Sequence, residues 1–420
     1  MHSIDIPWGM GIPFVLLLLA IALLPLVRPD FWHPNRNKAW LTLALILPVA
    51  LFFGAGHAGE LFAALEEYFS FIVMIGALFV ISGGIVCYGD LQATPRVNTL
   101  LLLVGALLAN LIGTTGASML LVRPLLRTNR ERKHTKHIPV FFIFLVANIG
   151  GSLTPLGDPP LFLGYLRGVP FQWNLSLLPQ WLIATGILLA VFYLWDRRCY
   201  AREDSQALQA DRNQIEPLRL AGRINLLFML GVVAAVAFQM PAPYRELVML
   251  SMTLLSLACT KKGLRADNGF TWHPLLEVVI LFLGIFITMR PLLLVLEAHG
   301  PALGIVRPWQ YFWLTGGLSA FLDNAPTYLT FFSLAESVTR SLGAAGTVLV
   351  AGVRHDLLSA ISCGAVFMGA LTYIGNGPNF MIQSIAREQG QSIPNFFEYM
   401  AYSGAILLPL LGLLTLLFFI

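Results

Sequence analysis

The chain has 420 residues, of which 57% are hydrophobic and 11% are charged, less than half of the roughly 25% charged residues of an average soluble domain. With a mean hydropathy of +0.75, this is not the composition of a water-soluble protein, and it predicts a bundle of membrane-spanning helices. The net charge of +4 does not indicate nucleic-acid binding, and the four cysteines lack the spacing of a zinc site or a disulfide framework.

Long apolar segments follow one another from the start of the chain. The first run, 11–27, follows a stretch without Lys or Arg and has no small-residue cleavage pattern after it, so we predict a membrane span and not a signal peptide. The polar stretch 196–223 is predicted to be a cytoplasmic linker between a first half, 1–195, and a second half, 224–420. The twelve apolar segments are 11–27, 39–55, 69–87, 98–126, 138–165, 176–195, 224–240, 246–259, 275–296, 309–335, 358–382 and 399–419.

Two of these segments are interrupted in the middle by polar and helix-breaking residues, at 109–118 and 320–327. In hydrocarbon every backbone N–H and C=O needs a partner, so such breaks persist only where protein or a watery cavity surrounds them. We therefore predict re-entrant hairpins at about 98–126 and 309–335, each entering and leaving on one side. Five crossings and one hairpin per half then invert the second half relative to the first.

The distribution of Lys and Arg favours one orientation. If the N-terminus lies outside, six predicted cytoplasmic connections hold 19 of the 26 Lys and Arg residues, as the positive-inside rule requires. Ten crossings then place both termini on the outer face of the cytoplasmic membrane. A full crossing at 98–126 would instead put the five bases of 127–137 outside. The six connections are 28–38, 87–97, 127–137, 196–223, 261–273 and 383–398.

A short motif occurs once in each half. Residues 151–162 align without gaps on 369–380 at a constant offset of 218, with Gly, Leu, Thr, Gly, Pro and Phe identical. Because Pro lacks its N–H and clashes with the preceding turn, we expect broken helices at about 138–165 and 358–382. The predicted fold is an all-α polytopic membrane protein of two inverted-topology repeats, each with five crossings including one broken helix, plus one re-entrant hairpin. This arrangement is typical of secondary transporters.

Two carboxylates lie on the break motifs. An ionisable group at mid-span costs about 2.5–3.5 kcal/mol, so it marks a functional position by default. We predict that Asp158 and Asp323 bind Na⁺ or H⁺, with Na⁺ held at Asp323, Asn324, Asp158 and Thr154. The alternative is that either Asp only forms a turn or a helix cap. The other residues expected at the ion or substrate site are Thr327, Thr372, Asn376, Asn379, Thr114, Thr115 and Asn110.

Two arginines within apolar segments, Arg123 and Arg290, each adjoin a proline near a segment end. We expect them to snorkel or to pair with a carboxylate such as Glu277, and the alternative is that they bind a substrate carboxylate. Fixed carboxylates at the breaks would repel an organic anion unless Na⁺ bound first.

The residues around the breaks resemble a known family. Residues 148–160 (Asn-Ile-Gly-Gly-Ser-Leu-Thr-Pro-Leu-Gly-Asp-Pro-Pro) and 322–327 (Leu-Asp-Asn-Ala-Pro-Thr) resemble the ion transporter superfamily, particularly NhaD-type sodium/proton antiporters and the citrate transporters related to them. The resemblance covers essentially the whole chain. It implies two inverted repeats with scaffold and mobile parts, a homodimer with elevator-like motion, and Na⁺ sites at the hairpin tips. Unlike the dicarboxylate branch, which has Ser-Asn-Thr at both tips, this chain has Gly-Thr-Thr at 113–115 and Asp-Asn-Ala at 323–325.

We therefore expect a secondary transporter of the cytoplasmic membrane that exchanges Na⁺ or Li⁺ for H⁺ by alternating access, without a cofactor. The alternative is Na⁺- or H⁺-coupled transport of citrate or another organic anion, with arsenite efflux more remote. The sequence has no HExxH or GxSxG motif, which argues against an intramembrane enzyme.

Overall fold

The computed structural model describes residues 6–213, 215–342 and 347–420, and 76% of the chain is helical. Within these ranges, six helices are long and apolar enough to cross a membrane, and further apolar helices are shorter. The protein is therefore a polytopic all-α membrane protein, as the composition predicts. The six long helical stretches are Asn35–Gly54, Ala58–Gly83, Pro95–Thr128, Phe171–Tyr200, His273–Leu303 and Phe396–Phe418.

The first half and the linker contain nine helices and two strands within the described ranges. These are α1 (Ile12–Val27), α2 (Pro29–Trp32), α3 (Asn35–Gly54), α4 (Ala58–Gly83), β1 (Val86–Asp90), α5 (Pro95–Thr128), α6 (His137–Leu145), α7 (Pro159–Leu166), α8 (Leu178–Tyr200), α9 (Ser205–Asn213) and β2 (Glu216–Ala221), with 3₁₀ turns η1 (Trp8–Gly11), η2 (Ile149–Leu153) and η3 (Phe171–Leu177).

The second half has a similar succession of elements. These are α10 (Ile224–Ala237), α11 (Tyr244–Cys259), α12 (Leu264–Asp267), α13 (His273–His299), α14 (Pro308–Ser319), α15 (Asn324–Leu342), β3 (Leu349–Val350), β4 (Val353–Arg354), α16 (His355–Met368), α17 (Gly377–Glu388) and α18 (Phe396–Phe418), with 3₁₀ turns η4 (Gly300–Leu303) and η5 (Gly369–Leu371).

Helix α5 reverses direction within its 34 residues. A straight helix of this length would separate its ends by about 50 Å. Instead, Asn98 near its start and Asn129 at its end exchange side-chain hydrogen bonds of 2.9 and 2.8 Å. The reversal occurs at Gly113, whose φ of 77° is readily adopted only by glycine. We call residues 95–112 and 114–128 the two arms of α5.

Helices α14 and α15 form the corresponding reversal in the second half. The chain turns between Ser319, where α14 ends, and Asn324, where α15 begins. The rings of Tyr311 in α14 and Phe331 in α15 then lie 6.3 Å apart, so α15 returns along α14.

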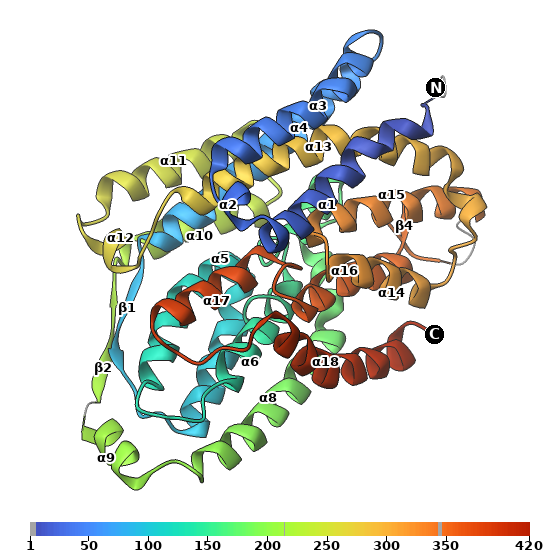
Figure 1. The fold of residues 1–420 in the computed structure, drawn as a ribbon. Helices are drawn as coiled ribbons and strands as arrows, with labels where there is room; N and C mark the ends of the chain where they lie inside the picture. The colour runs from blue at the N-terminus through green and yellow to red at the C-terminus, as the bar shows by residue number, and fades with distance from the viewer. Residues whose placement is uncertain (1–5, 214, 343–346) are drawn as a thin grey trace.

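The six connections predicted to be cytoplasmic meet at one end of the molecule, which we call the basic end. Strand β1 pairs antiparallel with β2, although about 130 residues separate them. The sequence did not predict these strands, because each is too short to show a periodic pattern. Figure 1 shows β1, β2, α9 and α12 together at this end. Further contacts between these connections join Arg132 to Asp196 (2.6 Å), Tyr88 to Asp267 (2.5 Å), Lys136 to Glu398 (3.1 Å) and the rings of His33 and His273 (centroids 5.6 Å apart).

The other connections meet at the opposite end, which we call the far end. The C-terminus lies there (Figure 1), beside Arg307. Three contacts that join these connections are Glu60 to Arg290 (2.5 Å), Glu67 to Arg167 (3.2 Å) and the indole N–H of Trp173 to His355 (3.0 Å).

The expected pairing of Arg290 with a carboxylate is confirmed, but the partner is Glu60 and not Glu277. Both residues belong to α13, but thirteen residues, or about 20 Å of helix, separate them. Arg290 pairs with Glu60 at the far end, and Glu277 pairs with the buried Lys38 at 2.8 Å near the basic end. Arg123 donates to the carbonyl oxygen of Asn268 at 2.7 Å.

Cysteine labelling in intact cells tests which end faces the cytoplasm. His134 at the basic end and Val348 at the far end are both exposed. In a background without the four native cysteines, we expect an impermeant maleimide to label Val348→Cys from outside, and to label His134→Cys only after the cells are permeabilised. Labelling of His134→Cys in intact cells would contradict the predicted orientation.

Candidate functional site

The carboxylate of Asp158 lies buried where the two halves meet. Its Oδ1 accepts hydrogen bonds from the hydroxyl of Thr114 at 2.8 Å and from Nδ2 of Asn376 at 3.1 Å. Its Oδ2 accepts a hydrogen bond from Nδ2 of Asn324 at 2.5 Å. Asp158 and Asn376 correspond in the sequence repeat, so equivalent positions of the two motifs are in direct contact.

Four helix starts converge on this carboxylate. Asp158 is the N-cap of α7, Asn376 is the N-cap of α17, Asn324 begins α15, and Thr114 begins the second arm of α5. The positive end of each helix dipole favours negative charge there. The three side-chain donors are neutral, so no positively charged side chain among them neutralises the carboxylate when it is ionised.

One buried oxygen at the site lacks a partner within the described ranges. The side chain of Asn324 is fully buried, and its Oδ1 accepts no hydrogen bond. Its Nδ2 is directed at Asp158, which orients Oδ1 away from that carboxylate oxygen. A buried acceptor without a partner is costly, so this atom is a candidate ligand for a cation or a proton donor.

A second group of amides lies beside Asp158. Nδ2 of Asn376 also donates to the backbone oxygen of Ala147 at 3.0 Å and to Oδ1 of Asn148 at 3.2 Å. Asn148 in turn donates to Oδ1 of Asn379 at 2.7 Å. Sequence reasoning did not select Asn148 as a site residue, although a buried Asn within the apolar segment 138–165 was the available signal.

The two breaks are built alike. The hydroxyl of Thr154 donates to the backbone oxygen of Asn110 at 2.5 Å, and that of Thr372 donates to the backbone oxygen of Ala320. Both acceptors lie at the turn of a hairpin. The structure therefore places these two hydroxyls on the hairpin turns and not on the Asp158 carboxylate.

The other predicted site residues lie close by but make local contacts. The carboxylate of Asp323 accepts from the backbone N–H of Ala325 at 3.1 Å, and the hydroxyl of Thr327 donates to the backbone oxygen of Asp323 at 2.9 Å. These are the bonds of a helix start. Asn110 binds the backbone of η2 through Gly150 (2.6 Å) and Leu153 (2.8 Å), and Thr115 is partly exposed with no side-chain hydrogen bond to the described residues.

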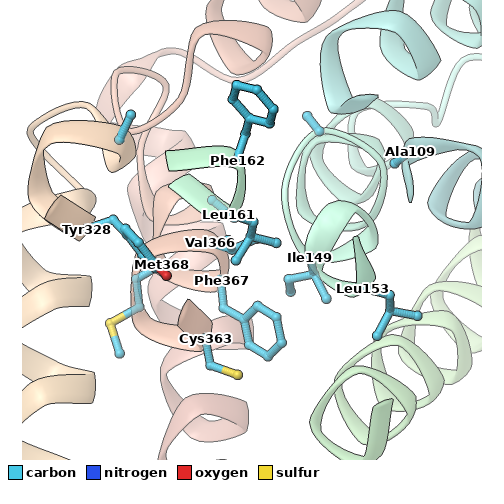
Figure 2. Packing of buried hydrophobic residues seen from close by; sticks show 14 of the residues in the cluster. Ala109, Ile149, Leu153, Leu161, Phe162, Tyr328, Cys363, Val366, Phe367 and Met368 are labelled. Carbon is cyan, nitrogen blue, oxygen red and sulfur yellow. The ribbon is translucent and has the colours of Figure 1, made fainter. Parts of the chain in front are cut away.

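Apolar side chains fill the space around the broken segments. Figure 2 shows Leu161 of α7 next to Val366 of α16, with Ile149 of η2 and Phe367 close by. All four are at most 1% exposed. Asp158 is itself 1% exposed, so its polar group is enclosed within the protein. Within the described ranges, no three His, Cys, Asp or Glu side chains form a group that could hold a metal ion.

The close approach of backbone at each break predicts which glycines are essential. A Cβ on Gly157 would lie 1.9 Å from the backbone oxygen of Gly151, while a Cβ on Gly377 would meet nothing within 4 Å. We expect Gly157→Ala to abolish the folded protein and Gly377→Ala to be tolerated, as measured by the yield of monodisperse protein in detergent. Equal yields of the two variants would contradict the observed geometry.

Comparison with known proteins identifies a family and a related membrane protein. The sequence matches the family described as "Putative citrate transport" over residues 3–419. A 46 kDa membrane protein of Mycobacterium leprae (strain TN) is 25% identical over 328 residues, which is 72% of each chain. Because the match to the family covers residues 3–419 of the 420 in this chain, the chain belongs to this family of membrane transport proteins.

Proposed function

We propose that the protein is a secondary antiporter that exchanges Na⁺ for H⁺ at Asp158. The observation that carries this proposal is a buried carboxylate whose donors, Thr114, Asn324 and Asn376, are all neutral. Asp323 directly precedes Asn324, which donates to Asp158, so it adds a second carboxylate near the site. A site with two carboxylates and neutral oxygen atoms suits a hard cation.

Na⁺ and H⁺ compete for the Asp158 carboxylate, and this competition couples Na⁺ transport to H⁺ transport. Na⁺ can bind Asp158 only after the proton leaves, and a proton can bind only after Na⁺ leaves. Exchange follows if the site opens to one side at a time. We propose that the two halves are inverted repeats, with the α5 and α14–α15 hairpins and the two broken segments moving together. The residues proposed to form the site around the ion are Asp158, Asp323, Asn324, Asn376 and Thr114, while Asn110, Thr154, Thr327, Thr372 and Asn379 hold the hairpin turns and broken segments in place.

Transport of citrate or another organic anion is the second candidate. Two observations favour it: the description of the family, and the four helix starts, whose N–H groups and dipoles suit a carboxylate ligand. Against it, the fixed charges of Asp158 and Asp323 would repel a multiply charged anion unless a cation bound first.

Reconstitution into proteoliposomes tests the proposal. The vesicles hold a pH-indicating dye, and Na⁺ is added outside. We expect the interior to become alkaline as H⁺ leaves in exchange for Na⁺, while choline causes no change. An interior pH that does not respond to Na⁺ or Li⁺ would contradict Na⁺/H⁺ exchange.

We also propose that the basic end faces the cytoplasm and that the protein forms a homodimer. The first follows from the bias of Lys and Arg toward the six connections that meet there. The second is implied by the family resemblance and stays a prediction. Cross-linking in native membranes, followed by size analysis, checks it.

A further inference from the structure

The amide of Asn376 lies among three oxygen atoms. Its Nδ2 is 3.0 Å from the backbone oxygen of Ala147, 3.2 Å from Oδ1 of Asn148 and 3.1 Å from Oδ1 of Asp158. An amide NH₂ group has two hydrogens, so it cannot satisfy three acceptors fully. The side chains of Asn148, Asp158 and Asn376 are at most 3% exposed, so bulk water does not reach this position freely.

One helix end at this point opposes the positive dipole ends of the four helix starts. Ala147 follows the end of α6 (His137–Leu145), where the last carbonyl groups of the helix lack intrahelical partners. The C-terminal end of a helix dipole favours positive charge. One carboxylate oxygen, one amide oxygen and one helix-end carbonyl therefore surround a position that favours a monovalent cation over a neutral amide.

We propose that Na⁺ binds between the Ala147 carbonyl, Asn148 Oδ1 and Asp158 Oδ1, at the position that Nδ2 of Asn376 occupies in this structure. Asn376 is then a competitor of the ion and must turn aside when Na⁺ binds. The buried, unpartnered Oδ1 of Asn324 on the other side of the Asp158 carboxylate is a second oxygen oriented for a positive partner. This inference rests on the proposed function and deepens it by naming the ligands of the ion.

Ion binding then changes the contact between the halves. Asn376 belongs to the second broken segment, while Ala147, Asn148 and Asp158 belong to the first. When Na⁺ displaces the amide, its contacts with Ala147, Asn148 and Asp158 across the two segments are lost. Na⁺ binding thus alters the interface between the two broken segments, and alternating access requires this interface to change.

Two substitutions should shift the affinity for Na⁺ in opposite directions. Asn376→Ala removes the competitor, so we expect the apparent Kd for Na⁺ to fall about threefold or more. Asn148→Ala removes a ligand, so we expect the apparent Kd to rise about tenfold. If Asn376 instead supplied a ligand oxygen, its removal would also raise the Kd.

The measurement uses the purified full-length protein in detergent at one fixed pH. NaCl replaces choline chloride at constant ionic strength, and the shift of the melting temperature gives the apparent Kd. Thr253→Val is the matched control, because among the described residues the Thr253 hydroxyl bonds only to the carbonyl of Met249 in its own helix α11 (2.8 Å). We expect this variant to respond to Na⁺ as the wild type does.

The outcomes separate this inference from the proposed function. A wild type whose melting temperature does not respond to Na⁺ would contradict Na⁺ binding altogether. If the wild type responds but Asn376→Ala binds Na⁺ equally or more weakly, the competitor role is overturned and the antiport proposal survives. If Asn376→Ala does not fold, Asn376→Ser replaces it in the same measurement. If neither variant folds, an Asn148→Ala variant whose apparent Kd for Na⁺ equals that of the wild type would overturn the proposed set of ligands.

Discussion

Asp158→Asn is expected to abolish Na⁺-dependent proton movement while leaving the protein folded. The substitution removes the carboxylate on which Thr114, Asn324 and Asn376 converge and keeps its shape. Removing one partner of a buried charge pair costs about 2–5 kcal/mol, which corresponds to about 30- to 4,000-fold weaker Na⁺ binding. Neutralising a mid-span charge also lowers an insertion cost of about 2.5 kcal/mol or more, so membrane insertion should not suffer.

The dye assay in proteoliposomes measures this effect, with Asp323→Asn as the comparison. The Asp323 carboxylate bonds only to the backbone N–H of Ala325 among the described residues, so we expect its neutralisation to reduce exchange less than that of Asp158. Elution of both variants as monodisperse protein shows that they are folded. Full Na⁺/H⁺ exchange by the Asp158→Asn variant would rule out the mechanism.

Asp196→Ala is expected to destabilise the protein by about 3 kcal/mol, because it removes the shorter of the two ion pairs of the buried Arg132 guanidinium and leaves only Glu203 at 3.5 Å. Asp196 is fully buried, and its carboxylate accepts from Arg132 at 2.6 Å and from Asn98 at 3.0 Å and contacts His137 at 2.9 Å. Asn98 lies near the start of α5 and Arg132 follows its end. The carboxylate thus holds both arms of the hairpin against α8, and its loss should also loosen the hairpin turn at Thr114.

Denaturation in detergent, followed by tryptophan fluorescence, measures this change. The matched control is Arg340→Ala, which removes an exposed ion pair with Glu336 in α15 (3.0 Å) and should cost about 0.3–0.5 kcal/mol. Similar losses of stability in the two variants would show that the Asp196 cluster does not hold the hairpin.

Much of the fold could be predicted because the membrane limits what a chain can do. Apolar runs about 20 residues long must be helices, and polar or Pro-Gly interruptions must be enclosed by protein. The interruptions at Gly113 and at 320–323 accordingly mark chain reversals in the structure. The strands β1 and β2 were not predicted, since their pairing depends on contacts far apart in the sequence.

The composition of the site was harder to derive. A motif shows which polar residues lie at a break, but the rotation of each helix decides which side chains meet. Asn324 turns toward Asp158, while its neighbour Asp323 is engaged by the start of its own helix. Asn148 follows helix α6 and contacts Asn376 and Asn379 at the start of α17. This contact depends on how α6 packs against α17, which the sequence does not reveal.

The most direct test of Na⁺/H⁺ exchange is uptake of labelled Na⁺ into proteoliposomes with an acidic interior, compared with uptake of labelled citrate in the same preparation. We expect Na⁺ to accumulate while the pH gradient lasts, uptake to stop when an ionophore collapses that gradient, and citrate to remain at the level of empty vesicles. Citrate accumulation together with Na⁺ uptake that does not depend on the pH gradient would contradict the antiport mechanism and establish organic-anion transport instead.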